Sequence, residues 1–158
     1  MEKKKTCCII INDFCNFDYT EQNESKKKEK TEKIRKELSR LKAEGVSHFI
    51  SGCEQGIDLC FAEEVLGDGS LTLECACAYE EQANFYSEKE REKYFNVLKK
   101  CNSITFVSKK RDFGCKTKRD RYMIEKSDYI VCFWDKIAPY TGELLQFAAS
   151  YNKKISYI

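Results

Sequence analysis

The sequence predicts an α/β fold with a mainly parallel sheet of about six strands and helices on both faces. Short apolar runs alternate with longer amphipathic stretches from end to end, which is typical of β-α-β units. Most of these runs are continuous, as in strands covered on both faces. The length of 158 residues, without internal repeats or a proline- or glycine-rich linker, fits a single domain over 1–158. Together these observations indicate a three-layer, Rossmann-like arrangement.

The strands are expected where an apolar run is short and bounded by polar or turn-forming residues. In chain order they are Cys7–Ile11, His48–Ser51, Thr72–Cys77, Ser103–Val107, Tyr129–Trp134 and Ile155–Ile158.

The amphipathic stretches between these runs predict the helices. They are Ser25–Glu44, Gly56–Leu66, Ser87–Lys100, Lys116–Lys126 and Gly142–Asn152. The first carries Ile34, Leu38 and Leu41 at helical spacing. The third opens on Ser87 with Glu90 three residues later, which predicts a capping box.

Charge and hydropathy narrow the range of partners. The 28 basic and 26 acidic residues nearly cancel, so the chain lacks the field that holds nucleic acid by counterion release. The apolar run Thr6–Ile11 is too short for a signal or transmembrane core. We therefore expect neither a nucleic acid nor a membrane as partner, and a cytoplasmic location.

We expect the ten cysteines to be small buried apolar residues of a protein in a reducing compartment. The close pairs, Cys7–Cys8 and Cys75–Cys77, lack the C-x-x-C spacing that binds one zinc ion. The only histidine, His48, lies inside an apolar run. We expect no metal site and no disulfide.

The first candidate site runs from Ile50 to Asp58, which leaves a strand, turns through two glycines and enters a helix. Glycines allow close backbone approach, and N–H groups at a helix start attract anions. The expected ligand-binding residues are Ser51, Gly52, Cys53, Gln55, Gly56 and Asp58. The alternative is structural, with Asp58 only complementing the helix dipole.

Two further segments are expected near the same sheet edge. Thr141, Gly142 and Glu143 follow the fifth strand, where open parallel sheets bind ligands; the alternative is an ordinary loop with Thr141 as N-cap. Arg119 can make a bidentate phosphate contact, in which case Arg121 points elsewhere. The alternative is a basic surface helix.

A fourth segment, Tyr79–Tyr86, follows the third strand and is polar and rich in aromatic residues. Such a loop can stack against and hydrogen-bond a nucleobase. Equally, Phe85 and Tyr86 can simply pack the start of the next helix.

These four segments, in this order and spacing, resemble the YpsA-like family of the SLOG superfamily, which joins the Smf/DprA proteins and the "Lonely Guy" phosphoribohydrolases. The resemblance is carried by His48–Gly52, Gly56–Asp58, Leu73–Ala76, Gln82 with Arg91 and Tyr94, Lys118–Met123, and Ser127–Asp128. It implies a Rossmann-like sheet with a pocket for a nucleotide or nucleotide-derived ligand. Secondary site residues are then Asn12, Asp13, Gln82 and Tyr122.

The chain departs from the family pattern at three places. Members usually have Thr-Gly-His-Arg where Ile11–Phe14 stands, Asn at the place of Asp120, and Gly-Gly-Thr at the place of Pro139–Thr141. Each change weakens anion binding. We therefore expect an altered or degenerate pocket.

The phosphoribohydrolases have an arginine followed four residues later by methionine, as with Arg119 and Met123. They also have a glutamate three residues after a threonine, where this chain has Leu144 after Thr141. Glu143 comes one residue early, about 100° away on a helix.

The leading hypothesis is therefore a nucleotide- or nucleotide-derivative-binding domain, with a sensor or regulatory role rather than an enzymatic one. A small nucleotide-type ligand is its expected partner, and no cofactor is assigned. One alternative is a nucleoside-phosphate or nucleotide-sugar hydrolase that uses Arg119 and Glu143. The other is a protein–protein adaptor, and a homo-oligomer stays open.

Overall fold

The computed structural model describes residues 3–11, 24–134, 136 and 138–158, and these form one six-stranded parallel sheet. The strand order is β4-β3-β2-β1-β5-β6. The strands are β1 (Lys5–Ile11), β2 (Val46–Ser51), β3 (Thr72–Cys77), β4 (Ser103–Phe106), β5 (Tyr129–Phe133) and β6 (Lys154–Tyr157). The predicted parallel α/β fold is confirmed, with Ser51 at the carboxyl end of β2.

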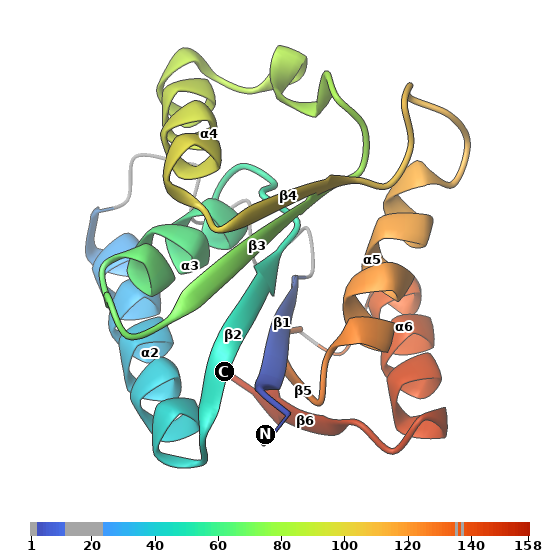
Figure 1. Ribbon diagram of the computed structural model, residues 1–158. Helices are drawn as coiled ribbons and strands as arrows, with labels where there is room; N and C mark the ends of the chain where they lie inside the picture. The colour runs from blue at the N-terminus through green and yellow to red at the C-terminus, as the bar shows by residue number, and fades with distance from the viewer. Residues whose placement is uncertain (1–2, 12–23, 135, 137) are drawn as a thin grey trace.

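Helices cover both faces of the sheet and complete the three layers (Figure 1). They are α2 (Glu24–Ala43), α3 (Ile57–Leu66), α4 (Glu88–Lys100), α5 (Cys115–Lys126) and α6 (Pro139–Ser150), with a 3₁₀ turn η1 (Gln82–Phe85). Helices α2, α3 and α4 lie on one face, and α5 and α6 on the other (Figure 1).

The two layers of helices explain why β1 is apolar at successive positions. Cys7 and Ile9 belong to the core under α2 and α3, whereas Cys8 and Ile10 belong to the core under α5 and α6. Adjacent residues of a strand point to opposite faces, so both sets must be apolar.

Helix α6 begins at Pro139, three residues before the predicted start. Proline suits the first helical position because its fixed φ is helical and its missing N–H would have no intrahelical partner. Thr141 and Gly142 therefore lie in the first turn of the helix, and Ala138 is the N-cap instead of Thr141. The alternative of an ordinary loop with Thr141 as N-cap is therefore wrong, and the predicted helix starts three residues earlier.

The predicted capping box of α4 forms only in half. The Glu90 N–H donates to Ser87 Oγ at 3.3 Å, but the Glu90 carboxylate accepts from the Gly56 N–H at 2.9 Å. The Ser87 N–H donates instead to Gln55 Oε1 at 3.3 Å. The missing half of the box is thus replaced by contacts that tie the start of α4 to the turn after β2.

The nine cysteines in the described ranges are free, and all except Cys101 are buried. Burial raises the pKa of Cys8 to about 12. Across the same ranges, no group of three or more His, Cys, Asp or Glu residues is arranged to hold a metal ion. No helix of the described chain has the length and apolarity needed to span a bilayer.

Candidate functional site

A cavity of about 390 Å³ lies at the carboxyl ends of the central strands. The helix after β1 covers one face of the sheet and the helix after β5 covers the other, so the chain switches faces between these neighbours (Figure 1). Ligands of open α/β sheets bind outside such a switch point. The cavity is lined by the end of β1, the turn before α3, α5 and the start of α6, including Glu54, Asp58, Arg119, Asp120 and Tyr140.

The turn after β2 is held together by the chain's own side-chain oxygens. The buried Ser51 hydroxyl donates to Asp58 Oδ1 at 2.6 Å and accepts from the Cys53 N–H at 3.1 Å. The Glu54 N–H donates to Asp58 Oδ2 at 3.2 Å. The Gly56 N–H donates to the Glu90 carboxylate of α4 at 2.9 Å. Three N–H groups of the predicted anion-binding turn are therefore already bonded within the chain.

Asp58 does more than complement a helix dipole, because it joins the Ser51 hydroxyl to the turn backbone. Burial raises the pKa of Asp58 to about 6, although the hydrogen bond from Ser51 and the charge of Arg119 oppose the rise. At neutral pH this carboxyl is mostly ionised, and it becomes neutral under mildly acidic conditions.

Gly52 leaves room for side chains of the protein itself. A Cβ built there would lie 3.0 Å from both Arg119 Nε and Asp58 Oδ2. Gly56, the N-cap of α3, has φ 96°, which favours glycine, whereas Cys53 has φ 56° without being glycine. The two glycines thus serve close internal packing and a left-handed turn.

Arg119 is 5% exposed and paired with two carboxylates. Its Nη1 donates to Glu54 Oε1 at 2.8 Å and its Nε to Asp120 Oδ1 at 2.9 Å. Burial alone would lower the pKa of Arg119, but the charges of Asp120 and Glu54 outweigh it and raise this pKa well above its ordinary value. Arg121 is exposed and lies 5.1 Å from the Phe147 ring, so the two arginines point apart as predicted.

Glu54 links this ion pair to neighbouring groups. It also lies 3.6 Å from Lys116 Nζ and accepts a 3.1 Å hydrogen bond from the Tyr86 hydroxyl. Burial alone would raise the pKa of Glu54, but the charges of Arg119 and Lys116 outweigh it and lower this pKa. Glu54 is therefore an ionised partner of Arg119.

The start of α6 approaches Arg119 through Tyr140, whose hydroxyl donates to Asp120 Oδ2 at 2.7 Å. Burial and the charge of Asp120 raise the pKa of Tyr140, so the phenol stays a neutral donor. Thr141 is buried and lines the cavity, whereas Gly142 and Glu143 are not among the lining residues. Glu143 is exposed.

A second cavity of about 780 Å³ adjoins the first, between η1 and the loop from β4 to α5. On its wall, the Gln82 amide accepts from the Ala78 N–H at 2.7 Å and donates to the Gly52 carbonyl at 3.0 Å. Gln82 therefore links neighbouring loops. Tyr86 is buried as the packing alternative predicted, whereas Phe85 is exposed.

Not every predicted site residue joins this site. The Tyr122 hydroxyl donates to Glu74 Oε2 at 2.7 Å, and Tyr122 lines neither cavity. Asn12 and Asp13, like Asp135, lie outside the described residues. Sequence reasoning did not identify Glu54 as the partner of Arg119, and the only available signal was an acid inside the glycine turn.

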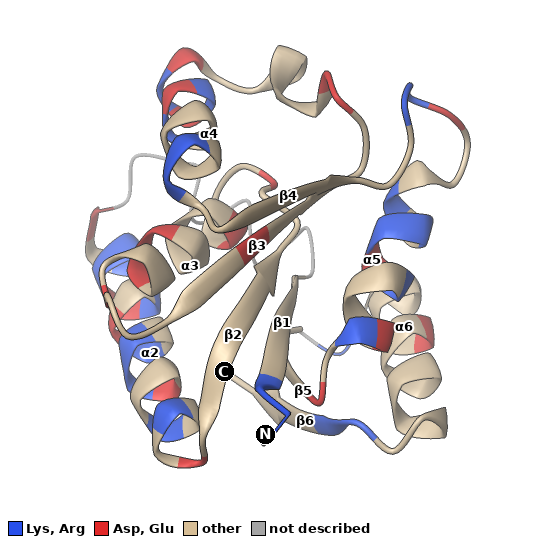
Figure 2. Cartoon of the chain, in the orientation of Figure 1, with Lys and Arg blue, Asp and Glu red and all other residues tan. Residues whose placement is uncertain are grey.

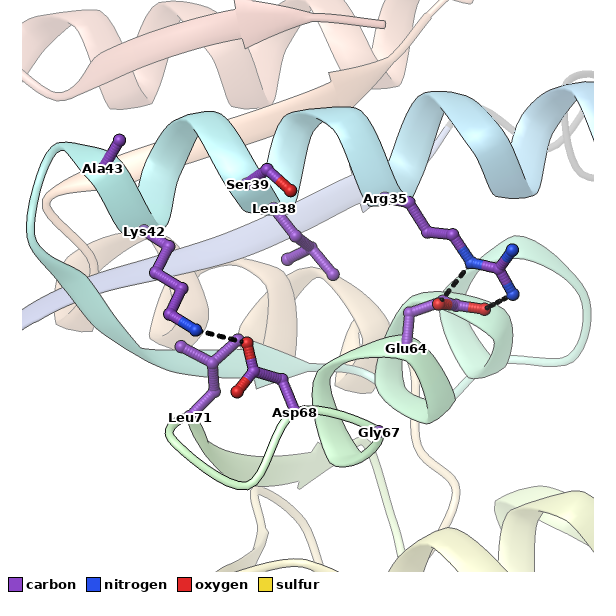
Figure 3. Close-up of a pocket in the computed structure, with 9 residues that line it drawn as sticks. All are labelled: Arg35, Leu38, Ser39, Lys42, Ala43, Glu64, Gly67, Asp68 and Leu71. Carbon is purple, nitrogen blue, oxygen red and sulfur yellow. Dashed lines mark hydrogen bonds and ion pairs between the residues drawn. The ribbon is translucent and has the colours of Figure 1, made fainter.

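A separate cavity of about 550 Å³ lies between α2 and α3 (Figure 3). Its charged side chains already pair with one another, Arg35 with Glu64 at 2.8 and 3.0 Å and Lys42 with Asp68 at 2.8 Å. Because Asp68 belongs to the turn before β3, this cavity reaches the amino ends of the strands, whereas Arg119 lies at their carboxyl ends. It adds nothing to the candidate site.

Two solved structures have a similar fold. The DNA processing protein A (DprA) of Streptococcus pneumoniae superposes with a TM-score of 0.66 at 9% identity, covering 98% of this chain and 50% of that chain. DprA of Helicobacter pylori, whose structure is described by its single-stranded DNA binding mode, gives 0.60 at 16% identity, covering 97% and 64%. The chain thus spans between half and two thirds of these proteins, and at such identities the likeness shows the fold alone.

Sequence comparison identifies the family. No curated protein matches the chain. The YpsA family model, described as the YspA SLOG family, matches residues 13–157, which is most of the chain. The resemblance seen in the glycine turn and around Arg119 is therefore confirmed, and the chain belongs to the YpsA family of SLOG proteins.

Proposed function

We propose that this protein binds a nucleotide or nucleotide derivative in the cavity at the β1–β5 switch point, and that it acts as a sensor or regulator. The observation that carries the proposal is the buried guanidinium of Arg119 on the wall of that cavity. A buried arginine fork suits a phosphate group, and the family match and the placement at a switch point support a nucleotide.

Binding of a phosphate requires a local exchange of partners. Arg119 is now held by Glu54 and Asp120, so a ligand phosphate must replace one of these carboxylates. Glu54 is the one better placed to leave, because its side chain is 24% exposed against 10% for Asp120. Lys116 lies beside Glu54 and can then accompany either the carboxylate or the phosphate.

The hydrolase alternative has less support. Glu143, the acid that it needs, is exposed and does not line the cavity. Among the described residues, three acids do line it: Glu54 and Asp120 are paired with Arg119, and Asp58 is hydrogen-bonded to Ser51 and to the backbone of the turn. The adaptor alternative and a homo-oligomer are addressed by the experiments below.

We favour a small ligand over a polynucleotide. The net charge is +2, and basic and acidic segments interleave along the helices (Figure 2). Nucleic-acid binding uses a continuous basic surface, whereas basic and acidic positions alternate along the ribbons of α2 and α4 (Figure 2). The single-stranded DNA binding described for the H. pylori protein makes an oligonucleotide a necessary arm of the test. The cytoplasmic location is part of the proposal, and the free thiols of the nine cysteines in the described ranges support it.

Calorimetric titration with a nucleotide panel and a short single-stranded oligonucleotide tests the proposal. Wild type should bind at least one nucleotide, and Arg119→Ala should weaken it by a charge-assisted contact, about 1.5–3 kcal/mol. Arg121→Ala is the matched control, since it removes an exposed arginine of the same helix that points away. Thermal unfolding of each variant identifies loss of folding.

The proposal fails if no nucleotide binds wild type at millimolar concentration. It also fails if the Arg119→Ala variant, still folded, binds the ligand as wild type does. Binding of the oligonucleotide alone contradicts the choice of a small ligand, and hydrolysis of a panel member supports the enzymatic alternative.

A further inference from the structure

The second cavity is bordered by two exposed aromatic side chains from distant parts of the chain. Phe85, at the end of η1, is 76% exposed, and Phe113, in the loop before α5, is fully exposed. Both line the same cavity of about 780 Å³. Exposed large apolar side chains that border one cavity indicate a binding surface rather than core packing.

The chemistry around these rings suits a flat aromatic ligand. The Arg111 guanidinium lies 5.7 Å from the Phe85 ring centroid, within the range of a cation–π contact. Nucleobases stack on phenylalanine faces and on guanidinium planes alike. Arg111, in the loop before α5, and Phe85, in η1, therefore place a flat cation over an aromatic ring in the cavity lining.

Two polar side chains on the cavity wall, Gln82 and Tyr86, are engaged with the protein. The Gln82 amide bonds to backbone groups at both its oxygen and its nitrogen, and the Tyr86 hydroxyl donates to the Cys53 carbonyl at 2.9 Å. Neither Gln82 nor Tyr86 is therefore available to recognise the hydrogen-bonding edge of a base. Stacking should then dominate, with little preference among bases.

The two cavities adjoin each other along shared residues. Glu54, Gln55, Lys116 and Tyr140 line each of them. A ligand with its ring between Phe85 and Phe113 can therefore direct its phosphate past Lys116 toward Arg119.

We propose that the second cavity binds the base of a mononucleotide by stacking on Phe85 and Phe113. The inference rests on the proposed function, because it assigns the ring of the same ligand whose phosphate meets Arg119. A free nucleotide fits better than a strand because Arg111 and Lys116 alternate with Asp112 and Glu54 around the cavity.

The test compares AMP, adenosine and ribose 5-phosphate in calorimetric titrations. Phe85→Ala and Phe113→Ala should each weaken AMP and adenosine about tenfold. Ribose 5-phosphate, which has no base, should bind all variants alike. Phe95→Ala is the matched control, since Phe95 is also exposed but lies on α4 outside both cavities. The substituted positions are exposed, and circular dichroism of each variant confirms folding.

Several outcomes overturn the inference. If Phe85→Ala and Phe113→Ala bind AMP as wild type does while Arg119→Ala weakens it, the base site is wrong and the proposed function stands. If adenosine binding depends on Phe85 but Arg119→Ala changes nothing, the base site stands and the phosphate site is wrong. If neither AMP nor adenosine binds wild type at millimolar concentration, both fail.

The experiments also distinguish a mononucleotide from two other occupants of the second cavity, a DNA strand and a second copy of the chain. Binding of a short oligodeoxyadenylate without binding of AMP contradicts the mononucleotide assignment. Sedimentation that reports a smaller oligomer for Phe85→Ala, with unchanged AMP affinity, would instead assign the two rings to self-association.

Discussion

The Tyr140 hydroxyl donates a 2.7 Å hydrogen bond to Asp120 Oδ2, and the other oxygen of Asp120 accepts from Arg119 Nε at 2.9 Å. Tyr140 and Asp120 stand at two of the three places where the resemblance implies a departure from the family pattern. Their direct contact joins these two positions. One oxygen of Asp120 thus accepts from the arginine and the other from the phenol.

This pairing predicts coupling between the two residues. Tyr140→Phe should lower the free energy of unfolding by roughly 1–2 kcal/mol, because it removes a donor from a buried carboxylate. In a double-mutant cycle with Asp120→Asn, the coupling energy from denaturant unfolding should be at least about 0.5 kcal/mol. Tyr151→Phe, at an exposed tyrosine, should be neutral. Additive effects of the two substitutions would contradict a direct pairing.

Gly52→Ala should destabilise the protein by about 1–3 kcal/mol, because the new methyl group would meet Arg119 and Asp58 at 3.0 Å. The matched control is Gly69→Ala, since a Cβ at Gly69 has no neighbour within 4 Å. Chemical denaturation of both variants measures the difference. Equal stability of the two would show that the space beside Gly52 is not occupied as described.

Asp58 predicts a pH dependence of stability. Its pKa is raised from 3.8 to about 6 by burial, so the folded state binds this proton more readily than the unfolded state. The stability contributed by Asp58 is therefore greatest at low pH and is lost as pH rises from about 4 to about 6. The total change is up to about 3 kcal/mol.

The measurement is the unfolding free energy of wild type minus that of Asp58→Asn across this pH range. The difference should fall as pH rises. A difference that is constant or that increases would show that the Asp58 pKa is not raised in the folded protein.

The nine cysteines in the described ranges are free thiols. Without a reducing agent, the denatured protein should therefore show ten reactive thiols, these nine and Cys15. The native protein should react slowly, because eight of the nine described thiols are buried. Titration with a chromogenic disulfide measures both. A deficit of two thiols after denaturation would reveal a disulfide.

The fold could be predicted from sequence because its signals are local. Successive apolar residues such as Ile9 and Ile10 indicate a strand covered on both faces, and Pro139 is itself a signal for a helix start. The interior of the site could not be predicted, because its pairings are long-range. Glu54 and Arg119 are 65 residues apart, and Glu90 bonds to Gly56 across 34 residues.

The contacts of the glycine turn after β2 could not be predicted for the same reason. A glycine before a helix predicts close approach of some group to the backbone, but not which group. At Gly52 the approaching groups are Arg119 and Asp58 of the same chain. Whether a phosphate also approaches this turn stays a prediction.

The central claim is that a ligand phosphate takes the place of Glu54 on Arg119, and titration of the nucleotide panel into Glu54→Gln tests it most directly. Glu64→Gln is the matched control, because Glu64 also pairs with an arginine, Arg35, but at the cavity between α2 and α3 (Figure 3). Removing the competing charge should tighten nucleotide binding about tenfold in Glu54→Gln, equivalent to about 1.4 kcal/mol, and leave Glu64→Gln like wild type. Unchanged or weaker binding by Glu54→Gln, or no nucleotide binding by either protein, would contradict the claim.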